Sequence, residues 1–564
     1  MTSLSELTEV STRLRAHAGA PGELPPAAVA DLPSRSGVSG AFRPAPPVNE
    51  RIRSFERWSH ETLGLEACLD DLLSESLVLP LVIGGRKVLT GRLFDAVLPH
   101  DRHRVLATVH AAGEPEARSA VEAALAAAPA WAALPHEERV TIFLRAANLA
   151  AGPYRDRLVA ATMLNTSKTV GEAEADIAEL VDFFRFNAAA LLHIYEEQPL
   201  STTSALNRVD YRPLEGFVFA ATPFNFTSIA GNLPCAPALC GNTVVWKPAT
   251  SATLPAHYVM SLLGEAGLPP GVVNLVYGRG SDIGPVVLED PHLAGVHFTG
   301  STATFRSMWS EVGTNIGRYR AYPRLVGETG GKDFVLVHAS ADPAEVVRIL
   351  VQGAFGYQGQ KCSAASRAYV PEAMWPEVLA GLEGAVGRLS VGDVRDLHTD
   401  LGAVIDAEAF ERHSLAIAEV SSLPATRIVL GGRVESDPGW FVHPTVVETG
   451  DPGCRLLEEE LFGPIVTVHP YGEDRFDEVI ALVDATSPYG LTGSVVATDR
   501  LAIDGAVAGL RQAAGNFYVN EKPTGAVVGQ QPFGGARASG TNDKAGTMWN
   551  LMRWLSPRSI KERL

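Results

Sequence analysis

Short apolar segments alternate with stretches of helical periodicity from residue 216 onward. The first apolar segments of this pattern are 216–221, 243–246, 272–276 and 295–298. A helical stretch at 254–266 separates two of them and stops at Gly267, ahead of a pair of prolines. The alternation predicts an α/β fold, in which helical crossovers join parallel strands and cover both faces of the sheet. Ligands of such sheets bind beyond the carboxyl ends of the strands.

A second α/β run follows residue 328. Its expected elements are a strand at 334–337, a helix at 344–355 and a later strand at 465–469. Upstream, Ala and Leu recur at three- and four-residue spacing, which predicts helices at 116–133 and 135–151, and another helix is expected at 172–186. A chain of 564 residues is too long for one hydrophobic core, so two or three structural units are expected.

The charge balance and the cysteines argue against several classes of protein. A formal net charge of −17 argues against a nucleic-acid partner. The five cysteines form no CxxC pair and no cluster with zinc-ligand spacing, so neither a disulfide framework nor a metal site is expected. No long uncharged apolar run suits a membrane span, and the acidic residues Glu6 and Glu9 argue against a leader peptide. We therefore expect a cytoplasmic protein.

Cys362 lies in a turn rich in Gly and Gln, after the apolar segment 350–355 and before a strand expected at 367–370. A thiol presented there attacks a carbonyl carbon if its neighbours lower its pKa or stabilise the resulting oxyanion. The alternative is a buried, inert cysteine, because free cysteines are among the most buried residues. Two other residues favour the reactive interpretation, since Glu328 lies in a glycine-rich bend and Asn225 follows a strand. A nucleophile, a base and an oxyanion donor are then all available.

Three stretches resemble phosphate-binding elements. The glycines at 278, 280 and 284 have one residue too many for the dinucleotide fingerprint, so that signal is weak. The segment 298–302 is better placed, because a strand that runs into a Gly/Ser/Thr helix start offers backbone N–H groups to a phosphate. The alternative there is an ordinary helix cap. The glycine-rich loop 524–535 can approach an anionic ligand or be a simple connection.

By these motifs the chain resembles the aldehyde dehydrogenase superfamily, and within it the branch of pyrroline-5-carboxylate dehydrogenases, which oxidise glutamate-γ-semialdehyde. The resemblance runs from about residue 70 to residue 562. It is strongest in the segments 214–217, 223–227, 359–364 and 529–543. The Cys and Glu motifs indicate the superfamily, whereas 182–187 and the last of those segments indicate the branch. Several matched motifs in the right order are far more specific than any one of them.

The resemblance implies a role for each candidate site residue. Cys362 is the implied nucleophile, Glu328 the base that activates the hydrolytic water, and Asn225, with the backbone N–H of Cys362, the donor to the oxyanion of a thiohemiacetal. Loss of hydride leaves a thioester, which is then hydrolysed. The implied NAD contacts are Thr222, Lys247, Gly300, Ser301, Thr302, Ala303, Thr304 and Glu460. The implied substrate contacts are Ser363, Gly525, Ala526, Glu179, Phe226 and Phe533.

The resemblance also implies an aldehyde dehydrogenase-like fold with a Rossmann-type cofactor domain, an α/β catalytic domain and a small β arm for oligomerisation. The expected boundaries are 1–48 for an N-terminal extension, 49–197 and 213–327 for the NAD-binding domain, 328–530 for the catalytic domain, and 198–212 and 531–564 for the arm. A homodimer or higher homo-oligomer is implied, with a separate proline dehydrogenase as a further partner. NAD over NADP is an expectation of the branch alone, because Thr250 stands where several NAD-preferring relatives carry a glutamate.

Three functions compete at this point. The leading hypothesis is NAD-dependent oxidation of L-glutamate-γ-semialdehyde, in equilibrium with pyrroline-5-carboxylate, to L-glutamate in proline breakdown. A general dehydrogenase for simple aliphatic aldehydes is the second, and the expected carboxylate contacts at Ser363, Gly525 and Ala526 argue against it. The third is a non-catalytic dinucleotide-binding protein of the same fold, which the presence of all three catalytic residues disfavours.

Overall fold

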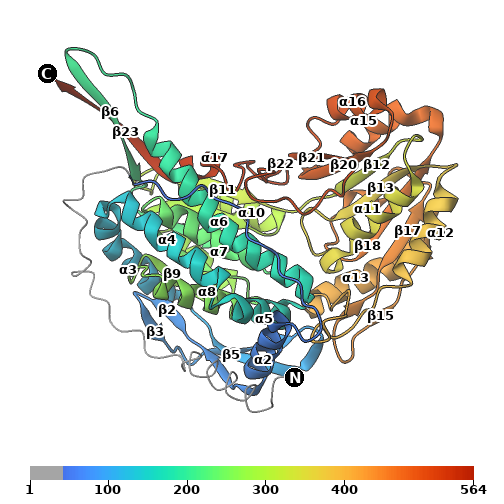
Figure 1. The fold of residues 1–564 in the computed structure, drawn as a ribbon, viewed down its shortest axis with the longest axis horizontal. Coiled ribbons are helices and arrows are strands. Elements are labelled where there is room, and N and C mark those ends of the chain that lie inside the picture. Colours follow the sequence, from blue (N-terminus) through green and yellow to red (C-terminus); the bar gives the residue numbers. More distant parts are fainter. Residues whose placement is uncertain (1–41) are drawn as a thin grey trace. The chain divides into compact units, whose positions relative to one another are not determined.

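The computed structural model of the protein describes residues 42–564, which contain two seven-stranded sheets (Figure 1). Most of the expected N-terminal extension, 1–48, lies outside the described residues. The first sheet has the strand order β11-β10-β7-β8-β9-β2-β3. Its strands are β2 Leu81–Ile83, β3 Arg86–Val88, β7 Phe217–Ala221, β8 Thr243–Lys247, β9 Val273–Leu275, β10 Leu293–Thr299 and β11 Arg324–Glu328. The predicted parallel arrangement is confirmed for β11 to β9, whereas β2 and β3 are antiparallel.

Helices cover this sheet and form a further layer. Both α3 (Glu114–Ala133) and α7 (Thr227–Leu239) pack on β8, and α6 (Val170–Glu196) lies against α7 with α4 (His136–Ala151) beyond it. The remaining helices of this part are α2 His60–Ser74, α5 Arg155–Thr166, α8 Thr253–Glu265, α9 Gly280–Leu288 and α10 Thr302–Thr314. Strand β7 is buried along its whole length, as expected for a strand covered on both faces.

The carboxyl ends of neighbouring strands in this sheet carry several of the predicted site residues. Thr299 pairs in register with Glu328 at the ends of β10 and β11. On the next strands, Ala221 pairs with Lys247 at the ends of β7 and β8. Because parallel strands end at the same edge, one edge of the sheet holds both a carboxylate and an ammonium group.

The second sheet has the order β14-β17-β18-β13-β12-β20-β21, in which only β14 is antiparallel to its neighbour. Its strands are β12 Asp333–Val337, β13 Ala365–Pro371, β14 Thr426–Leu430, β17 Thr445–Thr449, β18 Ile465–Tyr471, β20 Thr492–Val496 and β21 Asn516–Val519. The helices of this part are α11 Pro343–Phe355, α12 Trp375–Val386, α13 Ala407–Glu419, α14 Arg455–Glu458, α15 Phe476–Thr486 and α16 Arg500–Gly509.

Side chains of β12 alternate between two cores. Val335 and Val337 pack in one cluster with residues of α11 and α12, whereas Phe334 and Leu336 pack in another with residues of α15 and α16. Successive side chains of a strand point to opposite faces, so a strand with helices on both sides is apolar throughout. This is why 334–337 lacks the alternation of a half-exposed strand.

The other strands form small sheets. The longest of the two-stranded sheets pairs β6 (Ala205–Pro213) with β23 (Leu555–Arg563), which run antiparallel and project together (Figure 1). A three-stranded sheet has the order β1-β5-β4, and short pairs join β15 to β16 and β19 to β22. The bounds of these elements and of the last helix are β1 Leu77–Leu79, β4 Leu93–Leu98, β5 Asp101–His110, β15 Val434–Glu435, β16 Phe441–Val442, β19 Tyr489–Gly490, β22 Ala536–Arg537 and α17 Met548–Met552.

Two features differ from the sequence expectation. Glu328 is the last residue of β11 and does not lie in the glycine-rich bend, which begins after it. Helix α6, expected at 172–186, continues to Glu196 because Ala188, Leu191 and Ile194 bury one more apolar stretch. Within residues 42–564, no helix combines the length and the apolar character that a membrane crossing requires.

Candidate active site

The Cys362 turn joins the end of α11 to the start of β13, through a short 3-10 turn, Gly356–Gly359. Tyr357 and Gln358 adopt left-handed backbone conformations, with φ of 50° and 52°. Gly359 has φ of 63°, and a Cβ there would lie 2.3 Å from the carbonyl oxygen of Gly463. Non-glycine residues in this region are strained and persist only where their surroundings hold them. The turn therefore presents Cys362, which is 8 % exposed, in a fixed place.

The Glu328 carboxylate reaches this turn from the other sheet. Its Oε1 accepts a hydrogen bond of 3.1 Å from the backbone N–H of Gly535. Burial raises the pKa of Glu328 to about 8, and the Gly535 N–H opposes this rise. Burial likewise raises the pKa of the Cys362 thiol well above its ordinary value, and the nearby Glu328 carboxylate adds to the rise. Both groups are therefore neutral near pH 7 in this enclosure.

Asn225 lies between β7 and α7, and its side chain is 4 % exposed. Its Nδ2 donates a 3.0 Å hydrogen bond to the carbonyl oxygen of Gln360, two residues before Cys362. The structure therefore brings together the thiol, the carboxylate and the amide that the sequence singled out, from three separate segments. One N–H of the Asn225 amide remains for another acceptor.

The predicted cofactor contacts gather at the carboxyl edge of the first sheet. Thr222 accepts a 3.0 Å hydrogen bond from Trp246 Nε1, which fixes its hydroxyl. Lys247 Nζ donates to the carbonyl oxygen of Pro248 at 3.1 Å, and burial lowers its pKa to about 8. Ser301 caps helix α10, because its Oγ accepts from the backbone N–H of Thr304 at 3.2 Å. The backbone N–H of Gly300 bonds to the carbonyl oxygen of Glu328 at 3.2 Å, which ties this helix start to β11.

Glu460 approaches from the second half of the chain and packs on the glycines after Glu328. Its Oε1 accepts a 2.9 Å hydrogen bond from the backbone N–H of Gly331. A Cβ on Gly330 would lie 1.9 Å from Glu460 Oε2, so any other residue there would displace the Glu460 carboxylate. Burial raises the pKa of Glu460 to about 7.

The predicted substrate contacts fall into two groups. Glu179, Phe533 and Glu328 line one cavity of about 60 Å³. Glu179 Oε2 accepts a 3.0 Å hydrogen bond from Ser228 Oγ, and burial raises its pKa to about 8. The second group lies around the Cys362 turn, where the hydroxyls of Ser363 and Thr524 are hydrogen-bonded at 2.8 Å. Ser363, Gly525, Ala526 and Phe226 are not part of the lining of that cavity.

Sequence reasoning missed Lys168, Asp176 and Lys544. Lys168 and Asp176 form a fully buried ion pair behind Phe226, with Nζ and Oδ2 2.7 Å apart. Lys544 Nζ donates to the carbonyl oxygens of Gly515 and Gly534, both at 2.9 Å, and so fixes the loop that bonds Glu328. Their side chains are held by partners far along the chain, so nothing in the local sequence separates them from surface lysines and helix acids.

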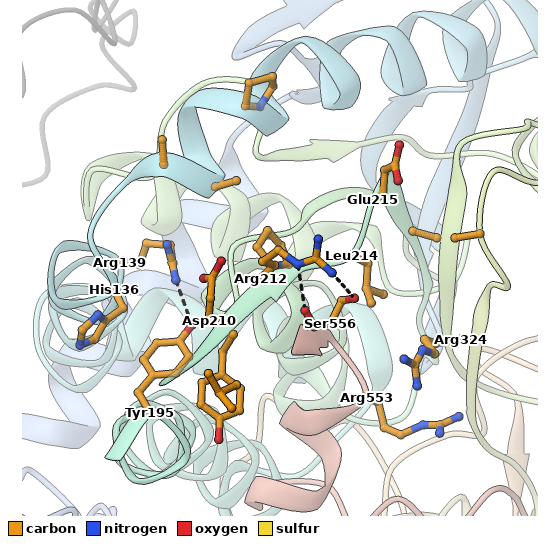
Figure 2. A pocket seen from close by; sticks show the side chains of 18 of the residues that line it. His136, Arg139, Tyr195, Asp210, Arg212, Leu214, Glu215, Arg324, Arg553 and Ser556 are labelled. Atoms are coloured by element: carbon orange, nitrogen blue, oxygen red, sulfur yellow. Dashed lines mark hydrogen bonds between the residues drawn. The ribbon is translucent and has the colours of Figure 1, made fainter. Parts of the chain in front are cut away.

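A separate cavity lies away from these residues, at the base of the β6/β23 arm (Figure 2). It has a volume of about 1190 Å³. Figure 2 shows Arg139, Tyr195, Arg212 and Arg324 around it, and none of the predicted site residues lines it. Size alone therefore does not locate the chemistry.

Residues 89–560 match the aldehyde dehydrogenase family. The mitochondrial delta-1-pyrroline-5-carboxylate dehydrogenase of Dictyostelium discoideum is 44% identical over 521 residues, 92% of this chain and 93% of that protein. The Mus musculus protein of the same name is 45% identical over 517 residues, 91% and 92% of the two chains. The crystal structure of the Mycobacterium tuberculosis delta-pyrroline-5-carboxylate dehydrogenase bound with NAD superposes with a TM-score of 0.90 at 51% identity, over 93% of this chain and 97% of the other.

Proposed function

The chain belongs to the aldehyde dehydrogenase family, and we propose that it oxidises L-glutamate-γ-semialdehyde, the open form of pyrroline-5-carboxylate, to L-glutamate with NAD, in the second step of proline catabolism. The observation that carries this proposal is the convergence of Cys362, Glu328 and Asn225 from three segments. Relatives named for this substrate cover nine-tenths of the chain, which supports this aldehyde over others.

In the first step, Cys362 Sγ adds to the carbonyl carbon of the aldehyde, and the thiol proton passes to the ionised form of the neighbouring Glu328 carboxylate. The carbonyl oxygen becomes an oxyanion, which accepts hydrogen bonds from Asn225 Nδ2 and from the backbone N–H of Cys362. Burial favours this chemistry, because preorganised donors in an enclosure that excludes water stabilise developing charge strongly. Such a donor typically contributes about 2.7–4 kcal/mol to lowering the barrier.

Loss of a hydride from the aldehyde carbon, for which bound NAD would supply the acceptor, leaves a thioester on Cys362, and in the second step water attacks this thioester. Glu328 takes the proton from this water, and the thiolate leaves as glutamate forms. A buried carboxylate suits this role, because a base with a pKa near the working pH is the most effective. The Gly535 N–H holds the Glu328 carboxylate in place for the attack.

The groups at the carboxyl edge of the first sheet fit a dinucleotide. The start of α10 offers the backbone N–H groups of Thr302 and Ala303 to a phosphate, and Lys247 Nζ and the Glu460 carboxylate are placed to bind the two riboses. Thr222, Gly300 and Ser301 complete this proposed site. NAD supplies the acceptor for the hydride that the aldehyde carbon loses.

The charged ends of the substrate need partners, because an unpaired buried charge is costly. We assign the α-amino group to Glu179 and the α-carboxylate to Ser363 and the backbone of Gly525 and Ala526. Phe226 and Phe533 flank the aliphatic chain. The buried, hydrogen-bonded carboxyl of Glu179 supports the first of these assignments, since an ammonium ligand would ionise it.

A steady-state assay of NADH formation tests the function. The wild-type protein is expected to turn over the semialdehyde, and Cys362→Ala to form no NADH, while the matched control Cys454→Ala, another buried thiol, keeps full activity. Equal kcat/KM for propanal and the semialdehyde would instead favour the general aldehyde dehydrogenase. No turnover by the wild type, or full turnover by Cys362→Ala, rules the proposal out.

The surroundings of the enzyme are part of the proposal. We propose a homodimer, because the β6/β23 arm is an isolated two-stranded sheet, which is marginally stable unless another surface covers it.

A cytoplasmic location is in keeping with five free thiols. A separate proline dehydrogenase, which would supply the substrate, is the proposed partner; a coupled assay without a lag in glutamate formation would support direct transfer.

A further inference from the structure

Lys168 lies in the turn between α5 and α6 and is completely buried. Its Nζ is 2.7 Å from Asp176 Oδ2. The same ammonium group lies 4.1 Å from the ring centroid of Phe226 and 4.7 Å from that of Tyr357. One carboxylate and two aromatic rings therefore enclose it, and both rings attract a desolvated cation.

Asp176 connects this ammonium group to the start of helix α7. Its two oxygens also accept 2.9 Å hydrogen bonds from the backbone N–H groups of Thr227 and Ser228. These are orphan donors of the first helical turn, and Phe226 at the N-cap position supplies no side-chain cap. A carboxylate at this end is favoured by the helix dipole. Asp176 thus fixes where α7 begins, two residues after Asn225.

Tyr357 connects the ammonium group to the Cys362 turn. Its backbone is left-handed, with φ of 50° and ψ of 45°, and its hydroxyl donates a 3.1 Å hydrogen bond to the carbonyl oxygen of Thr166. A non-glycine residue stays in this conformation only where neighbours hold it. Gln360, three residues further along the same turn, carries the carbonyl oxygen that accepts the hydrogen bond from Asn225 Nδ2.

We propose that Lys168 is a positioning residue that holds the two halves of the oxyanion site, the Asn225 segment and the Cys362 turn, in register. Its ammonium group contacts Asp176 and the rings of Phe226 and Tyr357, and acts on the site through them. This inference rests on the proposed function, since it assigns a second layer of residues to the same site. A buried ion pair is weak evidence for a stabilising role, so its place between two segments of the site is the informative observation.

The test replaces both charges together, because a single substitution would leave one buried charge without a partner. The variant is Lys168→Met with Asp176→Asn. The control is Arg155→Met with Glu174→Gln, which removes another buried ion pair between α5 and α6, with its atoms 2.6 Å apart. Arg53, which also pairs with Glu174, keeps Asp156 as a partner in this control. Tyr357→Leu, which keeps the ion pair and removes one ring, is a second variant in case the first does not fold.

We expect the Lys168/Asp176 variant to lose on the order of 10- to 100-fold in kcat with little change in KM, because a misplaced oxyanion donor affects the transition state. A loss in kcat should appear with propanal as well as with the semialdehyde, since both form the same oxyanion. Tyr357→Leu should lose kcat in the same direction. The control should keep the wild-type kcat even if its melting temperature falls.

Three results would overturn the inference: an unchanged kcat in the Lys168/Asp176 variant, an equal loss in the control, or a loss with the semialdehyde and none with propanal. A crystal structure of the variant gives a readout that needs no turnover. We expect the Asn225 to Gln360 hydrogen bond to be lost, and an intact bond contradicts the inference. Wild-type protein that oxidises only propanal would refute the proposed substrate and leave this test in force.

Discussion

At the scale of single residues, the base Glu328 and the nucleophile Cys362 are both uncharged in the resting site. Burial raises the pKa of Glu328 to about 8 and that of the Cys362 thiol well above its usual range. A carboxylate and a thiolate side by side would repel each other, so the neutral pair is the stable resting state. The pH dependence of the reaction should therefore follow the ionisation of Glu328.

The first prediction concerns this ionisation. A base must be deprotonated to accept a proton from water, so kcat should rise with pH up to about 8 and level off above it. Glu328→Gln should lose most of the activity and show no such rise. A pH–rate profile measures both, with the exposed Glu408→Gln as the control that keeps the wild-type profile. A wild-type profile that is flat from pH 6 to 9 contradicts the role of Glu328.

The same pKa also sets a trend in stability, with a fixed sign. The folded state holds the Glu328 proton more tightly than the unfolded chain, in which the pKa is near 4.5. Its contribution to stability is complete below pH 4.5 and is lost as the pH rises through about 8. Glu328→Gln should remove this loss, which melting temperatures at pH 5 and pH 8 would show as a smaller difference than in the wild type.

A second prediction separates glycines that are needed from glycines that are not. A Cβ on Gly327 would lie 2.2 Å from the Phe305 ring, so Gly327→Ala should destabilise the protein by about 1–3 kcal/mol and displace Glu328. Gly280, in the stretch that resembles a dinucleotide fingerprint, has no atom within 4 Å of its Cβ position. Gly280→Ala should therefore be neutral or stabilising by up to about 1 kcal/mol, because alanine favours the helix. Urea unfolding and kcat measure both variants.

At the scale of elements, a substitution at the start of α10 should change helix stability and cofactor binding in opposite directions. Thr304 lies in its first turn, at the end that bears the positive helix dipole. Thr304→Asp should raise helix stability by about 0.3–1 kcal/mol, while its charge repels the proposed phosphate and weakens NAD binding at least tenfold. The control Ser310→Asp, exposed and further along the helix, should leave the affinity unchanged. NAD titration and thermal unfolding give the two readouts, and equal NAD affinity in both variants contradicts the phosphate site.

The elements also show how far sequence reasoning reaches. Strands such as β12 and helices such as α3 follow from apolar periodicity, and the structure confirms them. Helix α7 follows only from the alternation of strands and helices, because Pro234 and Pro237 remove backbone donors and weaken its own helical pattern. There the packing of α7 on β7, β8 and β10 and the Asp176 cap outweigh the local preference. Asp176 and Thr227 are 51 residues apart in the sequence, so the sequence around α7 alone does not reveal this cap.

At the scale of the whole molecule, the site depends on groups that two sheets present. The first sheet supplies Glu328 and Lys247 from the carboxyl ends of its strands, and the second supplies Cys362 from the turn before β13. The short motifs around these residues are recognisable in the sequence, which is why the three catalytic candidates could be named. The positions of Lys168, Asp176 and Lys544 depend on how the sheets are joined, and short motifs do not encode this.

The last prediction concerns assembly, which is a property of the whole molecule. The arm carries exposed apolar side chains, with Leu206 48 % and Leu200 90 % exposed. In a homodimer a second copy covers this surface, so Leu206→Lys should shift sedimentation from dimer to monomer. The substitution would do little to a monomer, in which the side chain already faces water. Leu501→Lys on α16, where the leucine is 82 % exposed, is the matched control and should leave the dimer intact. A monomeric wild-type protein, or a dimer that survives Leu206→Lys unchanged, would mean that this face of the arm serves another purpose.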